Sequence, residues 1–190
     1  VDLWATSDGG AALVVSSVEY AKKIGRGDAV KIAAISTVTP TFASAVIEMP
    51  DIATDSAAAM QAHSFRAALP KKAYEEAGIG PEDVSLAEVY DLSTALELDW
   101  IEDLQLCERG QAAQMVREGT TRVGGSLPVN ASGGLACFGE AVPAQAIAQV
   151  CELTWQLRGQ AGARQVEGAK VGITANQGLF GHGSSVIVKK

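Results

Sequence analysis

Short apolar runs alternate along the chain with longer segments in which apolar residues recur every three or four positions. The run at 29–39 is rich in β-branched residues and is followed by Pro40, so it predicts a strand. Continuous apolar runs of this length are typical of strands that are buried on both faces. By the same pattern, further strands are predicted at 11–16, 85–90, 169–175 and 184–188.

A helical spacing of apolar residues predicts helices at 18–24, 56–77, 93–106, 111–118 and 142–157. Over 56–77, the apolar positions on one face are Met60, Phe65, Leu69 and Ala73. Proline lacks a backbone N–H and clashes with the preceding turn, so Pro70 predicts that this segment forms two helices.

The segment at 142–157 carries apolar residues at a spacing that places them on one face of a helix. These residues are Val142, Ala146, Val150, Leu153 and Leu157. We expect this face to pack on the core. Residues 41–55 are predicted to be irregular, and the small residues at 124–134 predict a loop.

Strands that alternate with helices predict an α/β domain, with a mixed or mostly parallel sheet covered by helices on both faces. The strand at 11–16 and the helix at 18–24 stand ahead of a complete α/β unit, and a single buried strand needs neighbours. We therefore expect these opening residues to belong to a sheet whose remainder lies upstream in a longer chain.

The composition of the 190 residues, 47% hydrophobic and 19% charged, indicates a packed core. A formal charge of −7 argues against nucleic acid as a partner, because phosphate binding requires a basic face. No apolar run is long enough to predict a membrane span, and the first residues do not resemble a signal peptide. The three cysteines form no C-x-x-C pair, which argues against a disulfide framework or a structural zinc and favours a reducing, cytoplasmic setting.

Residues 88–91 (EVYD) end a predicted strand with a phenol and a carboxylate. Ligands of α/β proteins commonly bind at the carboxyl ends of such strands, so Tyr90 and Asp91 are candidate site residues. A tyrosine can act as a general acid or base. The alternative interpretation, a buried tyrosine hydrogen-bonded to a neighbour, is equally compatible with the sequence.

Residues 130–140 (NASGGLACFGE) precede the predicted helix at 142–157. Gly133, Gly134 and Gly139 allow a sharp turn and a close approach of backbone to a ligand. Glu140 is either a site residue or a carboxylate that stabilises the start of the helix. The glycine spacing matches no nucleotide-binding motif, and a structural role is favoured for Cys137.

Two histidines, His63 and His182, could serve as bases. A surface or turn position is the favoured interpretation of His63. His182 lies in a glycine-rich segment at 178–183, which suits a ligand-binding loop and a hairpin turn equally well.

Several ordered motifs resemble the C-terminal half of the thiolase superfamily, in the branch of sterol carrier protein x thiolases and bacterial lipid-transfer proteins. They are SDGGAALVV at 7–15, PVNASGGL at 128–135, CELTWQLRG at 151–159, GAKV at 168–171 and NQGL at 176–179. The resemblance implies a βαβαβαββ domain at 26–190, with a mixed five-stranded sheet covered by helices. It assigns residues 1–25 to the end of the N-terminal half.

The resemblance also implies an acyl-CoA substrate, with coenzyme A as part of that substrate and no other bound cofactor or metal. The chemistry makes or breaks a carbon–carbon bond beside the thioester, in a protein that is usually dimeric. We expect Asn130, Gly133, Gly134 and Asn176, which lie in the matching loops, to bind the substrate.

Two positions depart from the thiolase pattern. The HDCF loop of this branch is YDLS at 90–93, so Tyr90 replaces its histidine and Leu92 replaces its acid–base cysteine. The histidine of the GHP motif falls at Glu140, where a carboxylate would repel a developing oxyanion. These losses make ordinary thiolysis an unfavourable interpretation.

Tyrosine at the start of that loop resembles a subgroup of thiolase-like aldolases that cleave β-hydroxyacyl-CoA thioesters in steroid side-chain degradation. That resemblance implies that Tyr90 and Glu140 serve as acid and base, that Asp91 orients the loop, and that His182 is a reserve candidate. It also implies a small OB-fold, zinc-ribbon partner protein. The alternatives are a thiolase-type acyltransferase that uses other groups, including Cys137, and a non-catalytic thiolase-like subunit that binds a partner or lipid.

Overall fold

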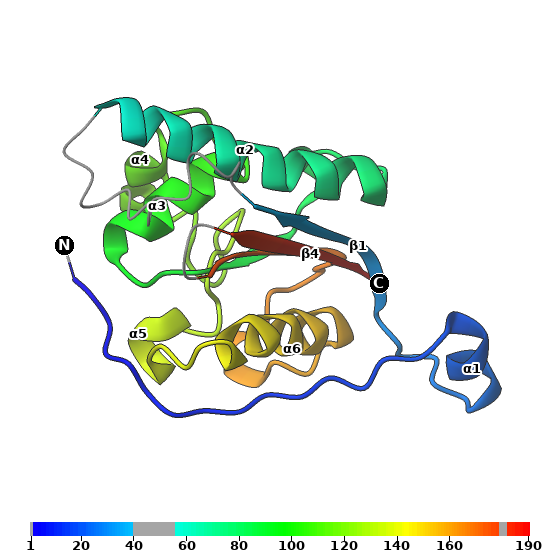
Figure 1. Cartoon of the computed structure of the whole chain (residues 1–190). Coiled ribbons are helices and arrows are strands. Elements are labelled where there is room, and N and C mark those ends of the chain that lie inside the picture. The colour runs from blue at the N-terminus through cyan, green and yellow to red at the C-terminus, as the bar shows by residue number, and fades with distance from the viewer. Residues whose placement is uncertain (1, 40–55, 179–181) are drawn as a thin grey trace.

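The computed structural model describes residues 2–39, 56–178 and 182–190, and only the backbone at 56–65 and 67 (Figure 1). In chain order, the described elements are α1 (Val18–Lys23), β1 (Lys31–Val38), α2 (Ser56–Ala77), η2 (Pro81–Asp83), β2 (Leu86–Val89), α3 (Thr94–Asp103), α4 (Ala112–Glu118), α5 (Gly134–Phe138), α6 (Ala144–Arg158), η3 (Gly162–Arg164), β3 (Val171–Gln177) and β4 (Gly183–Lys189). The alternation of helices and strands confirms the predicted α/β class. Residues 41–55, predicted to be irregular, lie outside the described residues.

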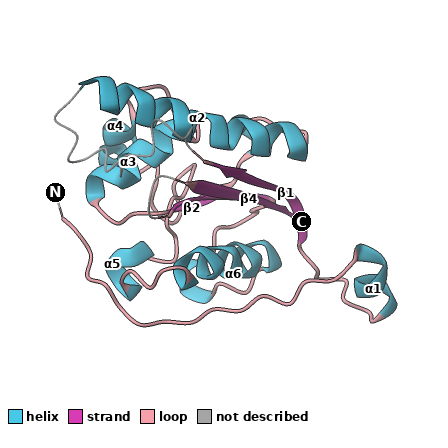
Figure 2. Ribbon diagram, in the orientation of Figure 1, coloured by secondary structure: helices cyan, strands magenta, loops and turns pink. Residues whose placement is uncertain are grey.

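The strands form a mixed sheet in the order β1-β4-β3-β2. β4 is antiparallel to both of its neighbours, and β2 is parallel to β3. Helices α2, α3 and α4 lie on one side of this sheet, and α5 and α6 lie on the other (Figure 2). The predicted mixed sheet between two helical layers is therefore confirmed.

The described sheet has four strands, so the expected count of five is wrong. A remnant of a fifth strand runs parallel to β2 at its free edge. The N–H of Ala87 donates to the carbonyl of Pro128 (3.0 Å), and the N–H of Asn130 donates to the carbonyl of Ala87 (2.9 Å). The segment then turns into the glycine loop after this single bridge, so it does not extend into a strand.

The predicted strand at 11–16 is also wrong. This segment is part of an extended arm that runs beneath α5 and α6 toward α1 (Figure 1), and Val14 is fully exposed. A strand requires a neighbour that accepts and donates its backbone hydrogen bonds. Within the described residues, the arm forms only isolated bridges, Leu3 to Ser93 and Thr6 to Glu140.

Helix α2 is continuous through Pro70, so the predicted division into two helices is wrong. Leu69 and Ala73, on either side of the proline, are fully buried, and α2 packs against β1 and β4. This packing stabilises the helix on both sides of Pro70 despite the hydrogen bond that proline cannot donate. The side chains of Met60 and Phe65 lie outside the described residues.

The core-facing side of α6 differs from the predicted apolar stripe. Val150, Leu153 and Leu157 are buried as expected, whereas Val142 is exposed and precedes the helix. Between the buried apolar residues lies a row of buried polar side chains: Gln145, Gln149, Glu152 and Gln156. The helix therefore meets the sheet through a mixed polar and apolar interface.

Candidate active site

The end of β2 meets the glycine loop at the carboxyl edge of the sheet. The N–H of Tyr90 donates to the carbonyl of Ala175 in β3 (2.8 Å), which fixes the first residue after β2. The loop at 130–133 and helix α5 lie against this end, so residues 88–91 and 130–140 form one site. Gly134 begins α5, which corrects the prediction that the loop continues through this residue.

Tyr90 and Glu140, fifty positions apart, are in direct contact. The Tyr90 hydroxyl donates a hydrogen bond to Oε1 of Glu140. Burial raises the pKa of Tyr90, and the hydrogen bond to Glu140 and the charge of that carboxylate raise it further. The phenol is therefore neutral near pH 7 and available as a proton donor, with the carboxylate as its acceptor.

The backbone of Glu140 is held by the N-terminal arm. Its N–H donates to the carbonyl of Ala5 (2.9 Å), and its carbonyl accepts from the N–H of Ser7 (2.9 Å). Helix α6 begins only at Ala144, after Pro143. Within the described part of the chain, Glu140 makes no hydrogen bond to the first turn of α6, so its contact with Tyr90 distinguishes it from a helix-capping carboxylate.

Asp91 lies against the start of α5. Its Oδ1 accepts a hydrogen bond from the N–H of Leu135 (2.9 Å). Burial raises the pKa of Asp91, while the N–H groups of Leu135 and Ala136 act in the opposite direction. This carboxyl group thus contacts the start of α5, next to the glycine loop, and its orienting role stays a prediction.

Asn130 uses its side chain to brace the loop. Its Oδ1 accepts from the N–H of Val89 (2.8 Å), and its Nδ2 donates to Oε1 of Glu97 (3.0 Å). Burial raises the pKa of Glu97 to about 6, and the nearby Asp91 adds to this effect. A side chain at Gly133 would meet the sulfur of Cys137, which is exposed on α5. Substrate binding by Asn130, Gly133 and Gly134 stays a prediction.

Asn176 and His182 lie at the same edge of the sheet, at the end of β3 and just before β4. The Asn176 side chain is buried and donates through Nδ2 to Oε1 of Gln149 (2.5 Å). His182 is exposed, and its carbonyl accepts from the N–H of Gly178 (2.7 Å). No described hydrogen bond or ion pair joins either residue to Tyr90 or Glu140. The side chain of His63 lies outside the described residues.

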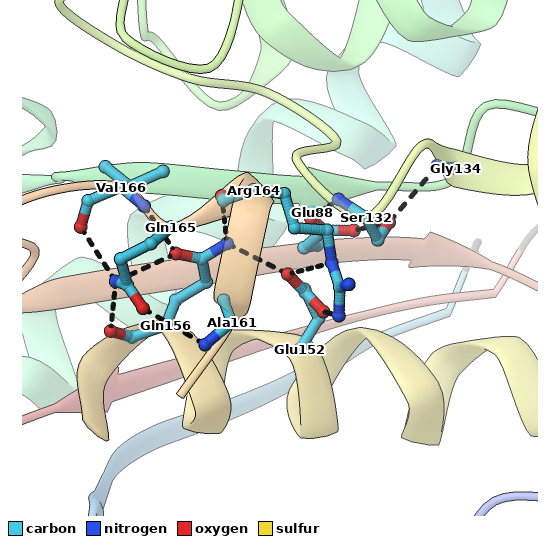
Figure 3. Close-up of polar contacts among 9 residues, drawn as sticks. All are labelled: Glu88, Ser132, Gly134, Glu152, Gln156, Ala161, Arg164, Gln165 and Val166. Atoms are coloured by element: carbon cyan, nitrogen blue, oxygen red, sulfur yellow. Dashed lines mark hydrogen bonds and ion pairs between the residues drawn. The ribbon is translucent and has the colours of Figure 1, made fainter. Parts of the chain in front are cut away.

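Glu88 is a site residue that the sequence analysis did not select. Its carboxyl group is fully buried and accepts from the N–H of Ser132 (3.0 Å), while the Ser132 hydroxyl lies 2.6 Å from its other oxygen (Figure 3). Burial raises the pKa of Glu88 to about 8. The available signal was a glutamate in the otherwise apolar strand at 85–90.

The described residues contain no further cluster of ligating side chains. No group of three or more histidine, cysteine or acidic side chains is placed to hold a metal ion in that part of the chain. No helix there is long and apolar enough to cross a membrane. A cavity of about 380 Å³, lined by residues such as Val84, Leu106 and Leu127, lies at the opposite end of β2.

Residues 41–190 match the family described as thiolase C-terminal domain-like. The chain belongs to the thiolase C-terminal domain family. Among the relatives of this thiolase domain is sterol carrier protein 2 of Rattus norvegicus, 41% identical over 93% of this chain and 31% of that protein. Another is benzoylsuccinyl-CoA thiolase subunit BbsB of Thauera aromatica, 33% identical over 85% of this chain and 39% of that protein.

The fold of the thiolase domain is also that of a solved structure, the Ltp2-ChsH2(DUF35) aldolase. The two align with a TM-score of 0.66 at 19% identity, over 84% of this chain and 39% of that chain. The chain spans about a third of the length of the first curated relatives that it matches, at 31% of each.

Proposed function

We propose that this thiolase domain provides the acid–base pair of a carbon–carbon lyase that cleaves β-hydroxyacyl-CoA thioesters with a lipid or steroid side chain. The observation that carries the proposal is the hydrogen bond from the Tyr90 hydroxyl to the Glu140 carboxylate. Leu92 stands where a thiolase needs an acid–base cysteine, and leucine has no proton to transfer. A phenol and a carboxylate in contact supply the two proton transfers of a retro-aldol reaction.

In the proposed reaction, the Glu140 carboxylate takes the proton of the substrate's β-hydroxyl group. The bond between the α and β carbons breaks as the new carbonyl forms, and its electron pair passes into the thioester enolate. Tyr90 gives its phenolic proton to the α carbon, which releases the shortened acyl-CoA. The proton on Glu140 then returns to Tyr90 along their hydrogen bond, so no external acid or base is consumed.

The raised pKa of Tyr90 supports this division of roles, because a neutral phenol donates rather than accepts a proton. Asp91 has an orienting role in this proposal, through its hydrogen bond to Leu135. His182, which lies at the same edge of the sheet, is the reserve candidate for either proton transfer. Coenzyme A enters as part of the substrate, and the proposal includes no metal.

A thiolase-type acyltransferase is the second candidate. It is favoured by the name of the thiolase subunit from Thauera aromatica and by Cys137, which is exposed on α5 beside the glycine loop. This candidate requires free CoA and a β-ketoacyl-CoA, whereas the lyase requires neither. The two reactions are therefore distinguished by the substrate and by the need for a thiol.

For the setting, we propose a cytoplasmic homodimer that works with a small OB-fold, zinc-ribbon partner. The three cysteines are free in the described structure, which supports a reducing compartment. The name of the structural neighbour joins two components, Ltp2 and ChsH2(DUF35), and another relative is named as a subunit. These names support an assembly of more than one kind of chain.

The test uses the native protein that contains this chain, co-expressed with any small OB-fold protein encoded beside it. A β-hydroxyacyl-CoA with a branched steroid side chain is supplied without free CoA, and the released ketone or aldehyde is measured. We expect turnover that falls at least a hundredfold in Tyr90→Phe and Glu140→Gln. Tyr74→Phe is the matched control, because Tyr74 is also buried and donates to a distant carbonyl, that of Leu104 (2.8 Å).

Two results contradict the lyase. One is full turnover in Tyr90→Phe, and the other is CoA-dependent cleavage of a β-ketoacyl-CoA without any thiol-free reaction. Loss of the latter activity in Cys137→Ala would support the acyltransferase. Specific binding of acyl-CoA without turnover of either substrate, with the partner present, would indicate a non-catalytic subunit.

A further inference from the structure

The buried carboxyl group of Glu88 has one main hydrogen-bonding partner, Ser132. Glu88 lies on β2 in a fully buried strand, and both of its oxygens contact Ser132 of the glycine loop. The Ser132 hydroxyl in turn accepts a hydrogen bond from the N–H of Gly134, the first residue of α5 (3.1 Å). A single side chain thus connects the end of the sheet to the start of this short helix.

A second carboxyl group, that of Asp91 on the other side of Tyr90 in the sequence, contacts the same turn. Oδ1 of Asp91 accepts a hydrogen bond from the N–H of Leu135. The end of β2 therefore contacts the turn at 132–135 through two carboxyl groups, those of Glu88 and Asp91. Helix α5 then runs for five residues and ends at Gly139, whose N–H donates to the carbonyl of Leu135 (2.7 Å). The next residue is Glu140. The location of its carboxylate relative to Tyr90 therefore depends on how the turn is held.

The charged groups around Glu88 disfavour its ionised form. Glu152 faces it from α6, and Asp91 faces it from the end of its own strand. The one cation that interacts with Glu88 in the described residues is Arg164, and this guanidinium already binds both oxygens of Glu152, at 3.0 and 2.8 Å (Figure 3). Burial and these charges outweigh the hydrogen bonds from the N–H and the hydroxyl of Ser132, which lower the pKa, so the pKa of Glu88 is raised to about 8.

We propose that Glu88 is a positioning residue of the active site, which holds the turn at Ser132 and so sets the contact between Tyr90 and Glu140. The proposal rests on the proposed function where turnover is concerned, while the pinning of the turn can be tested without turnover. Glutamine has the shape of the neutral glutamate, accepts from an N–H and donates to a hydroxyl oxygen. A glutamine at position 88 can therefore hold the turn at Ser132 as the glutamate does, whereas an alanine cannot.

The experiment compares wild type, Glu88→Ala and Glu88→Gln in the native protein with two readouts. The first is amide hydrogen exchange of the peptide covering 132–140, corrected for the intrinsic rate at each pH, and the second is steady-state turnover. In Glu88→Ala we expect this exchange to rise at least tenfold and kcat to fall at least tenfold, with KM changed less than threefold. In Glu88→Gln, exchange should be no faster than in wild type at pH 7, and kcat should lie within threefold of wild type.

The pH dependence separates positioning from general folding and needs no alanine variant. In wild type, opening of the turn exposes Glu88, so exchange over 132–140 should rise as the pH goes from 4.5 to about 8, the window between the ordinary pKa of Glu88 and its pKa in the folded protein, while Glu88→Gln shows no such rise. Glu152→Gln leaves the contacts of Glu88 with Ser132 intact but removes a neighbouring negative charge. Because that charge raises the pKa of Glu88, its removal should move the upper end of this window to lower pH.

Unchanged exchange over 132–140 in Glu88→Ala would overturn the proposal, as would the same pH dependence of exchange in wild type and Glu88→Gln. If Glu88→Ala does not fold, the comparison of wild type with Glu88→Gln decides the matter. An absence of lyase turnover in wild type contradicts the proposed function and not this inference, because hydrogen exchange then tests the role of Glu88 without turnover.

Discussion

The Asp91 carboxylate occupies the space in which a side chain on Gly134 would lie. A Cβ added to Gly134 would be 2.2 Å from Oδ2 of Asp91, and the backbone of this glycine has φ +58. Glycine is therefore required here for two reasons, the left-handed conformation and the close approach of the carboxylate to the start of α5.

Gly134→Ala should lower the free energy of unfolding by about 3 kcal/mol, the sum of a left-handed alanine and a steric overlap. Gly168→Ala is the matched control. Gly168 also has positive φ, but nothing lies within 4 Å of an added Cβ, so this change should cost only about 1 kcal/mol. Urea unfolding of both variants measures the difference, and equal losses would contradict the close approach of Asp91.

Glu88→Gln should stabilise the protein at alkaline pH and leave it nearly unchanged at pH 5. The unfolded state releases the Glu88 proton near the ordinary glutamate pKa of 4.5, whereas burial holds the proton in the folded state to about pH 8. The native state binds more protons in this window, so the stability due to Glu88 is present below pH 4.5 and is lost as pH rises to 8. The gain in Glu88→Gln at pH 8.5 should reach roughly 5 kcal/mol, since the pKa is raised from 4.5 to about 8 and each pKa unit corresponds to about 1.4 kcal/mol.

Urea unfolding at pH 5 and pH 8.5 checks this prediction. Glu167→Gln, which removes an exposed carboxylate, serves as the control and should differ from wild type by less than about 0.5 kcal/mol at both values. A stability difference between Glu88→Gln and wild type that does not change with pH would show that Glu88 is already ionised in the folded state.

Asp103→Asn should be among the most destabilising single changes in the α2–α3 interface. Asp103 is fully buried, and its oxygens bind Arg66 (2.9 Å) and Arg109 (2.5 Å). Loss of its charge leaves the buried Arg66 guanidinium poorly compensated, at an expected cost of about 3–5 kcal/mol. Arg109→Gln removes the half-exposed partner instead and should cost about 1 kcal/mol or less. Thermal unfolding compares the stability of the two variants. A greater loss in Arg109→Gln than in Asp103→Asn would contradict the buried ion pair of Asp103 with Arg66.

Substitutions at Gly172 on β3 and Leu153 on α6 should have strongly non-additive effects on the free energy of unfolding. A Cβ on Gly172 would lie 2.8 Å from a Leu153 methyl group, so Gly172→Ala overpacks the interface. Leu153→Ala alone leaves a cavity and should cost about 2–5 kcal/mol. The double variant should be at least about 1 kcal/mol more stable than the sum of the single changes predicts. A double-mutant cycle in urea measures this coupling, and simple additivity would contradict the contact.

Elements whose signal is local could be predicted from the sequence. The strands at β1 to β4 and the helices at α3, α4 and α6 follow runs and spacings that fall within single segments. The arm at 11–16 could not, because an apolar run has the same appearance whether or not a neighbouring strand exists. Pro70 misled the prediction because its local cost is offset by packing on β1 and β4, which the helix sequence alone does not contain.

The polar side of α6 shows the same limit at the level of single residues. Gln149 is buried because Asn176 meets it, and Glu152 is buried because Arg164 binds it. Each partner lies on another element, so a pattern within α6 cannot reveal the pairing. Tyr90 was selected because it ends a predicted strand and Glu140 because it lies in the glycine loop, and the family resemblance then gave them their roles. Glu88 was overlooked because its partner Ser132 lies 44 positions away.

The pairing of β1 with β4 fixes the order in which the sheet can be completed during synthesis on the ribosome. β1 reaches the rest of the described sheet only through β4, and about 145 positions separate the end of one from the start of the other. At translation rates of about 5–20 residues per second, β1 waits roughly 7–30 s for its partner. For that interval its edge is open to other chains, which makes the nascent protein a natural client for chaperones.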